Sequence, residues 1–507
     1  MYLKHCSGLL TISSIPRINF RFFCAPAKDG SNKLESKGKS LTYQELDYVK
    51  PPNYTSTYPM YKPLHMLQEE FMPEPNRTGS GPRLADYLAI KKIVKSLRTP
   101  QERIDFVNPY EREWTRVEKK WHRKWHPRLF STRKAWALPT IPKYFDCLSY
   151  YQYITKMRLV DDKKIFDGFF KDLILPTENF EKKVTESLIC YLFTESSDTY
   201  KIKTDKFLKA LFHDAQSCLS PKRQSLKDLR ISQTGRIESF WIRGGFTHLY
   251  EWHPEWAQQP IFDRRRAPKF IGDDRRKLGE LAFTMRDEFV IHLRQKQPMK
   301  ELFSLNETKL VESPLFEKDV DIKDICYSPK VFNLWPDADP LWQCPGYEYD
   351  CGETHKYGRV ALKNTFEIND YLDYWKPLEN EEDSVKNDMY KSVGVSSLFN
   401  WLNAQAHCDG YTQYTDLERP YVSNLILGDG NEFAFVTGQL NTLAINIDNP
   451  DFINNKTNAC YIDGPYNLYD KYDEETRSFY YLDEKGYHKK GLNKFVLSRI
   501  LQLIAKD

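Results

Sequence analysis

The sequence lacks long hydrophobic runs. In its 507 residues, no apolar run approaches the ~18 consecutive apolar residues that a membrane span needs. The mean hydropathy is −0.65, because charged residues are scattered along the whole chain. Cysteine is also sparse: there are ten, and no two form a CxxC pair. We therefore expect no membrane span, no disulfide scaffold and no zinc ribbon.

Recognised catalytic motifs are missing as well. The sequence has no G-x-S-x-G, no G-x-G-x-x-G after a strand and no kinase-like set. Cys344, Cys351 and His355 have a spacing that fits no common zinc site. His407 and Cys408 are neighbours in sequence, which rarely gives the geometry of a thiol and its base, and a helix end explains them better. We expect no catalytic residues, no metal and no cofactor, so the protein is predicted not to be an enzyme.

The first 28 residues contain no acidic side chain. They carry Ser and Thr hydroxyls and four basic residues, Lys4, Arg17, Arg21 and Lys28. An Arg-bearing, acid-free start is typical of a mitochondrial transit peptide. The apolar run at 9–12 is interrupted by Thr11, which is unlike a secretory signal. We predict that residues 1–28 are a transit peptide to the mitochondrial matrix; the alternative is an uncleaved disordered start.

The charges that are present are distributed unevenly. Residues 1–140 contain 25 Lys and Arg against 13 Asp and Glu, and residues 141–300 contain 29 against 22. Residues 301–507 reverse the balance, with 20 against 35. Such asymmetry indicates that the front of the chain contacts a polyanion and the back does not.

The hydrophobic pattern predicts an α+β fold, with a helical basic N-terminal half and a C-terminal helix plus antiparallel β-meander closed by a terminal helix. The predicted regions are a linker at 29–82, a helical basic RNA-contacting region at 83–235, a mixed region with a hairpin, a basic loop and acidic loops at 236–383, and a C-terminal α+β domain at 384–507. Helical repeats are expected at 84–97, at Phe180–Tyr191 and at Phe207–Leu211.

Turn residues predict two hairpins. The pair Gly244-Gly245 separates two β-prone runs. Asp429-Gly430 predicts a type I′ turn between strands at Tyr421–Leu427 and Asn431–Thr437, with a third strand at Leu440–Ile447. Helices at 395–406 and 492–504 complete the C-terminal half.

The segment Arg112–Lys134 is the strongest candidate for nucleic-acid binding. It has nine Lys and Arg against two Glu, and Trp114, Trp121 and Trp125 lie at helical offsets 0, 7 and 11. A helix would place the Trp rings on one face, where they either form core or stack on unpaired bases. The candidate RNA-binding residues here are Arg112, Arg116, Lys119, Lys120, Trp121, Arg123, Lys124 and Arg128.

A second basic cluster lies in a Pro- and Gly-containing stretch between 260 and 277. Loops of this composition commonly follow nucleic-acid phosphates, although a basic loop without a ligand is the alternative. Its candidate RNA-binding residues are Arg264, Arg265, Arg266, Arg275 and Arg276.

The C-terminal half contains four familiar segments, which are Ser397-Leu398-Phe399-x-Trp401, Arg419-Pro420-x-Val422-Ser423, Asp429-Gly430 and Gln439-Leu440-Asn441-Thr442-Leu443-Ala444. Together they resemble the programmed cell death protein nine family of mitochondrial ribosomal proteins, numbered thirty in the small subunit by its old name and placed on the large subunit. Phe240-Trp241-Ile242-Arg243-Gly244 and the Tyr-rich stretch 144–156 are similar to parts of the same family.

The resemblance implies a structural constituent of the large mitoribosomal subunit. The implied partners are mitochondrial rRNA and other large-subunit proteins, including a paralogue. It also implies that Phe399 and Trp401 are core residues and that Arg419 forms a buried ion pair or contacts rRNA. Three alternatives remain: the paralogue itself, large-subunit mitochondrial protein thirty-seven; a mitochondrial RNA-processing enzyme; and a scaffold whose basic front binds anionic lipid.

Overall fold

The structure is a computed structural model. It describes residues 135–506 except 145, 161–162, 171–172, 174, 194–197, 222, 247–280, 317–319, 338–340, 348–350, 379, 414, 448–453 and 484–485. The predicted transit peptide, the linker at 29–82 and the helix at 84–97 lie outside the described residues.

Ten strands form one mixed sheet: β1 Ala135–Leu138, β2 Met157–Val160, β3 Arg230–Arg243, β4 Leu281–Gln295, β5 Trp335–Asp337, β6 Cys344–Pro345, β7 Tyr357–Asn364, β8 Tyr421–Gly428, β9 Glu432–Leu440 and β10 Asn458–Asn467. Their order is β2-β10-β9-β8-β7-β4-β1-β5, and β3 pairs with β4 and β6. The pairs β1–β4, β2–β10 and β7–β8 are parallel, and the other pairs are antiparallel. The sheet therefore joins strands from the predicted mixed region to strands from the predicted C-terminal region.

The described α-helices are α7 Leu148–Thr155, α8 Lys163–Phe170, α9 Glu178–Phe193, α10 Tyr200–Leu219, α13 Thr308–Val311, α14 Glu367–Trp375, α15 Glu382–Cys408 and α16 Lys494–Ala505. Four 3-10 turns are η2 Gln224–Lys227, η5 Ile322–Asp324, η6 Pro329–Phe332 and η7 Ile445–Ile447. A separate small sheet comprises β11 Lys471–Asp473, β12 Ser478–Leu482 and β13 His488–Lys490. The mixed α+β class is confirmed. None of the described helices is long and apolar enough to cross a bilayer.

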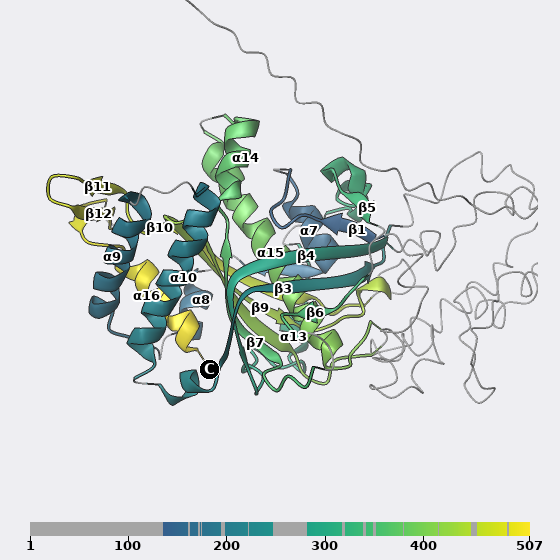
Figure 1. The fold of residues 1–507 in the computed structure, drawn as a ribbon. Helices are drawn as coiled ribbons and strands as arrows, with labels where there is room; N and C mark the ends of the chain where they lie inside the picture. The colour runs from purple at the N-terminus through teal and green to yellow at the C-terminus, as the bar shows by residue number, and fades with distance from the viewer. Residues whose placement is uncertain are drawn as a thin grey trace, which may run out of the picture. The chain divides into compact units, whose positions relative to one another are not determined.

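Both faces of the sheet are covered. Leu425 and Leu427 of β8 belong to one hydrophobic core with α7 and α15, whereas Ile426 between them belongs to a second core with α9, α10 and α16. This alternation follows from the two-residue period of a strand. Figure 1 shows α9, α10 and α16 grouped together, apart from α7 and α15. The predicted helical repeats at Phe180 and at Phe207 are confirmed, because their apolar side chains form this second core.

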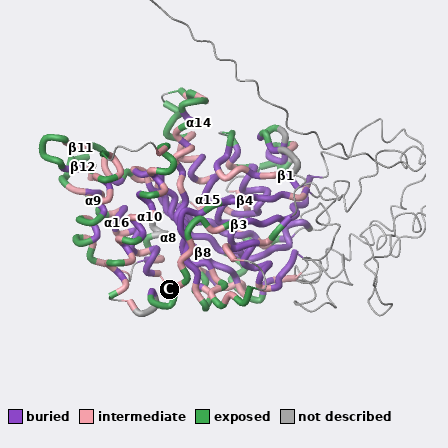
Figure 2. Tube along the Cα trace, in the orientation of Figure 1, coloured by how far each residue is buried: buried purple, intermediate pink, exposed green. Residues whose placement is uncertain are grey.

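Helix α15 is the centre of the first core. The sequence predicts a helix at 395–406, and the structure confirms it but extends it to Glu382–Cys408. Almost every residue from Met389 to Cys408 is buried. The added residues 382–388 are exposed or half-buried and four of them are charged, so they lack the apolar stripe on which the prediction depended. Figure 2 shows the buried tube running through α15 and the sheet, while the outer end of α14 is exposed.

The predicted hairpin at Gly244-Gly245 is wrong. The β-prone run before it is the end of one long strand, β3, and Arg243 pairs with Leu281 of β4 across a connection that contains the glycines. The Gly244 backbone N–H donates instead to the Ile445 carbonyl, at 3.2 Å. A local turn signal cannot reveal a pairing partner so distant in sequence.

The meander prediction is correct for β8 and β9 and wrong for the third strand. Strand β9 continues to Leu440, residues 445–447 form η7, and the third strand is β10. The Asn458 Oδ1 accepts from the backbone N–H groups of Asn441 and Thr442, at 2.8 and 3.0 Å. These side-chain hydrogen bonds replace the ladder and end the strand.

The turn between β8 and β9 also differs from the predicted type I′. Asp429 and Glu432 are joined by a backbone hydrogen bond, so the central residues are Gly430 and Asn431, one position later than expected. Only Gly430 has a positive φ, +108°. That is the pattern of a type II′ turn. The Asp429 carboxylate stabilises it by accepting from the Asn431 and Glu432 N–H groups.

The range predicted to be helical, 83–235, also contains the strands β1 and β2. Each has four residues, which is too short for a periodic pattern to distinguish from a helix. Both become strands by adding to the sheet, β1 beside β4 and β2 beside β10.

Candidate functional site

All thirteen candidate RNA-binding residues, from Arg112 to Arg128 and from Arg264 to Arg276, lie outside the described residues. The Trp114, Trp121 and Trp125 stripe lies outside them too. The site can therefore be built only from the other motif segments, and these converge around α15.

The segment Phe240–Gly244 docks on the Tyr-rich helix α7. The Trp241 indole N–H donates to the Ile154 carbonyl at 2.9 Å, and Arg243 Nε donates to the Tyr153 carbonyl at 2.6 Å. The Arg243 guanidinium lies over the Tyr153 ring, 4.1 Å from its centroid, and also donates to the Ile445 carbonyl at 2.9 Å. The Arg243 side chain is buried. It joins α7, β3 and η7, so its role in this part of the protein is structural.

The segment Gln439–Ala444 is held by amide side chains. Gln439 accepts from the Leu302 N–H at 2.8 Å and donates to the Phe303 carbonyl at 2.9 Å. Asn441 Nδ2 donates to the Thr457 carbonyl at 2.7 Å. Because these groups are buried and paired, they fix the loop between β9 and β10 rather than present donors to a ligand.

The polar residues of α15 are paired with the sheet. Lys363 of β7 forms a buried ion pair with Asp287 of β4 and donates to Ser397 Oγ at 2.9 Å. Burial lowers the pKa of the Lys363 ammonium, and the Asp287 carboxylate opposes that change. Asn403 Nδ2 donates to the Phe240 carbonyl at 3.1 Å. These contacts position α15 on the sheet.

His292 of β4 is a buried titratable group outside this network. Neither ring nitrogen has a hydrogen-bond partner, and burial is the main reason that its pKa is lowered to about 3. A Cβ added at Gly235 or Gly346 would lie 2.3 Å from the ring, so two glycines make room for it. The neutral ring packs against Phe289 and Trp401 and has no access to a substrate.

The expectations are met for two of three motif residues and only in part for the third, Arg419. Phe399 and Trp401 are fully buried, as expected of core residues. Of the two roles expected for Arg419, the structure shows the ion pair, which it forms with Asp409 at 3.3 Å. The guanidinium also lies over the rings of Tyr357 and Tyr421. The Arg419 side chain stays partly exposed, so the pair is at the surface rather than buried.

Of the cysteine and histidine residues noted in the sequence, Cys351 is exposed, whereas Cys344 and His355 have protein contacts. Cys344 Sγ lies 3.3 Å from the Arg236 carbonyl, and His355 lies between Glu353 and Asp228. Gly410, with φ +101°, ends α15 after His407, which is the helix-end role expected there. In the described part of the chain, no three His, Cys, Asp or Glu side chains are placed to hold a metal.

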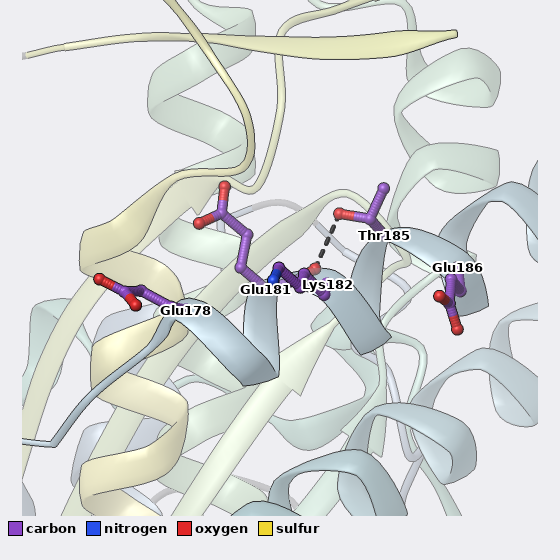
Figure 3. Close-up of a pocket in the computed structure, with 5 residues that line it drawn as sticks. All are labelled: Glu178, Glu181, Lys182, Thr185 and Glu186. Carbon is purple, nitrogen blue, oxygen red and sulfur yellow. Dashed lines mark hydrogen bonds between the residues drawn. The ribbon is translucent and has the colours of Figure 1, made fainter.

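Figure 3 shows a surface pocket along α9, lined by Glu178, Glu181, Lys182, Thr185 and Glu186. One helix supplies every lining residue. Thr185 Oγ1 donates to the Glu181 carbonyl at 2.7 Å, and Glu181 Oε1 accepts from the Leu492 N–H at 3.1 Å. These groups already have partners, so the pocket has no converging set of binding groups.

The comparison with protein families decides the identity. A family model described as "Mitochondrial 28S ribosomal protein S30 (PDCD9)" matches residues 24–507, nearly the whole chain. The chain belongs to this family.

Membership of the PDCD9 family makes the protein a mitochondrial ribosomal protein, a component of a ribonucleoprotein that works in mitochondrial translation in the matrix. A ribosomal protein has rRNA and other ribosomal proteins as its partners, and its role is structural. The resemblance drawn from the motifs is confirmed. The sequence did not indicate that Arg243 contacts Tyr153, because the two residues are 90 positions apart.

Proposed function

We propose that this PDCD9 family protein is a structural constituent of the large mitoribosomal subunit. The family match over residues 24–507 supports the ribosomal part of the proposal. The large-subunit placement is the expectation that the sequence resemblance implied. The buried contacts of Arg243, Gln439 and Lys363 support a structural role, because these polar side chains are paired within the protein. Partners would therefore bind to the surface. The family description carries a small-subunit number, so subunit placement is the point to test.

The basic front is the proposed rRNA contact. Residues 112–134 and 264–277 concentrate Lys and Arg, which would neutralise rRNA phosphates and release counterions. The acidic 301–507 part would be repelled by phosphates, and this favours protein neighbours for it. The paralogous mitochondrial protein thirty-seven is one proposed neighbour.

Residues 1–28 are proposed to be the import signal, because they are basic and acid-free. A fusion of about the first forty residues to a reporter is expected to enter the matrix. A cytosolic reporter would contradict this assignment.

A sucrose gradient of mitochondrial lysate tests the proposal as a whole. Co-migration of the full chain with the large subunit is expected. Migration with the small subunit would refute the placement, and free soluble fractions or a membrane pellet would favour the RNA-processing or lipid-binding alternatives.

A further inference from the structure

Helix α14 has one face packed and one face bare. Ile368 and Leu372 are buried in the core around α15, and the rings of Tyr371 and Trp375 stack at 5.6 Å beside them. These four residues follow the 0, 3, 4 and 7 spacing of a helix stripe. The inner face is therefore fully used by the fold.

The outer face carries Glu367, Asp370 and Tyr374, at offsets 0, 3 and 7. The helix ends at Trp375, and Leu378 lies in the segment that follows its C-cap. Tyr374 is 81% exposed and Leu378 is 65% exposed. Side chains this exposed bury little apolar area and so contribute little to folding stability. Within the described residues, neither Asp370 nor Asp373 forms an ion pair.

The N-terminus of α10 extends this surface. Lys201 pairs with Glu367 at 2.6 Å, and the rings of Tyr200 and Phe366 stack at 5.7 Å. Tyr200 itself is 67% exposed, and Ile202 next to it is exposed too. We name this surface the α14 face; it comprises Tyr200, Ile202, Asp370, Asp373, Tyr374 and Leu378.

Its charge selects the class of partner. From 367 to 388 the sequence has eight acidic residues and two basic ones. At the α10 edge Lys201 pairs with Glu367 and Lys203 lies over the Tyr200 ring, so the negative charge is concentrated on the α14 side. Phosphates are repelled by such a surface, so rRNA is disfavoured. Exposed apolar groups rimmed by charge are typical of protein interaction sites, and Tyr is frequent among binding hot spots.

We propose that the α14 face docks a Lys- and Arg-rich segment of a neighbouring ribosomal protein. The proposal rests on the ribosomal role given above and names a partner chemistry for it. Lys and Arg side chains would pair with Asp370 and Asp373, and one cation would lie over the Tyr374 ring while the apolar stems cover Leu378.

Photo-crosslinking in the assembled particle tests this. The full chain carries p-benzoylphenylalanine in place of Tyr374, and gradient-purified mitoribosomes are irradiated. The expected adduct maps to a Lys- and Arg-rich segment of another ribosomal protein. The same group in place of Tyr487, which is 69% exposed on the small sheet, serves as the control for exposure alone.

To test the dependence on charge, Asp370→Asn and Asp373→Asn are introduced into the chain that carries the crosslinking group at position 374. The yield of the adduct is expected to fall about five-fold, because two charge pairs are removed. The matched pair Glu474→Gln and Glu475→Gln, also exposed, should leave the adduct unchanged. An adduct to rRNA, an adduct to this chain's own basic front, or no adduct from particles that contain the chain overturns the proposal. A chain that never enters the particle refutes the ribosomal role instead.

Discussion

Replacing Arg243 with Ala would test whether the motif residues act as structural clamps. The change removes hydrogen bonds to the Tyr153 and Ile445 carbonyls and the contact with the Tyr153 ring. A hydrogen bond from a charged group contributes about 1.5–3 kcal/mol. Both carbonyls keep a backbone partner, because the Lys156 N–H donates to Tyr153 and the Gly244 N–H donates to Ile445, so the expected cost comes from the two lost bonds and the lost ring contact. We expect a loss of about 3–5 kcal/mol in the free energy of unfolding.

Urea unfolding of the full chain, followed by tryptophan fluorescence, measures this loss. Arg230→Ala is a matched control on the same strand, because Arg230 is 65% exposed and its ion pair with Glu353 spans 4.0 Å; it should change stability by less than about 0.5 kcal/mol. Arg243→Lys keeps the charge but not the planar fork and should fall between the two. Equal midpoints for Arg243→Ala and Arg230→Ala would refute the clamp.

Four further predictions concern the turn, the buried histidine, and the cations and Trp residues of the basic front. Gly430→Val should cost about 1–3 kcal/mol, because a β-branched residue tolerates positive φ poorly and a Cβ there would lie 2.7 Å from Tyr191 Oη. Gly486→Val is the matched control in thermal melts, because it has the same kind of backbone strain at positive φ without a close contact. Burial lowers the folded-state pKa of His292 to about 3. Between that pH and about 6.5 the unfolded chain binds one proton at this residue and the folded chain does not. The free energy of unfolding should therefore fall by about 1.4 kcal/mol per pH unit as the pH drops below about 6.5. His292→Leu should remove that slope in urea titrations from pH 7 to 5, and an unchanged slope would contradict the assignment. In the basic front, Gln replaces Arg116, Lys119, Lys120, Arg123 and Lys124. The slope of log affinity against log salt for rRNA fragments should flatten by roughly 0.7–0.9 for each phosphate interaction removed. An unchanged slope would exclude this segment as the rRNA contact. Trp121→Ala with Trp125→Ala should melt early if the rings are core, and should stay folded with weaker binding if they stack on bases.

Local patterns predicted the elements whose partners are near in sequence. The apolar stripe of α9 was predictable because it repeats from one helical turn to the next. The β8–β9 hairpin was predictable because its two strands are joined by a short turn with a recognisable sequence. The pairing of Arg243 with Leu281, and of Met157 with Asn458, was not. Nothing in a four-residue segment such as β2 specifies a partner in another part of the chain.

The same reasoning explains why the functional surfaces were harder to predict than the family. Phe399, Trp401 and Gln439 are distinctive because burial and pairing restrict what can occupy those positions, so they identify the fold without identifying a ligand. Nothing in the sequence distinguishes Tyr374 in α14 or Leu378 after its end, and only the packing of Ile368 and Leu372 on the opposite side of the helix shows that the outer side is left uncovered. A binding surface on this protein is thus a property of what the fold leaves uncovered, and the structure was needed to find it.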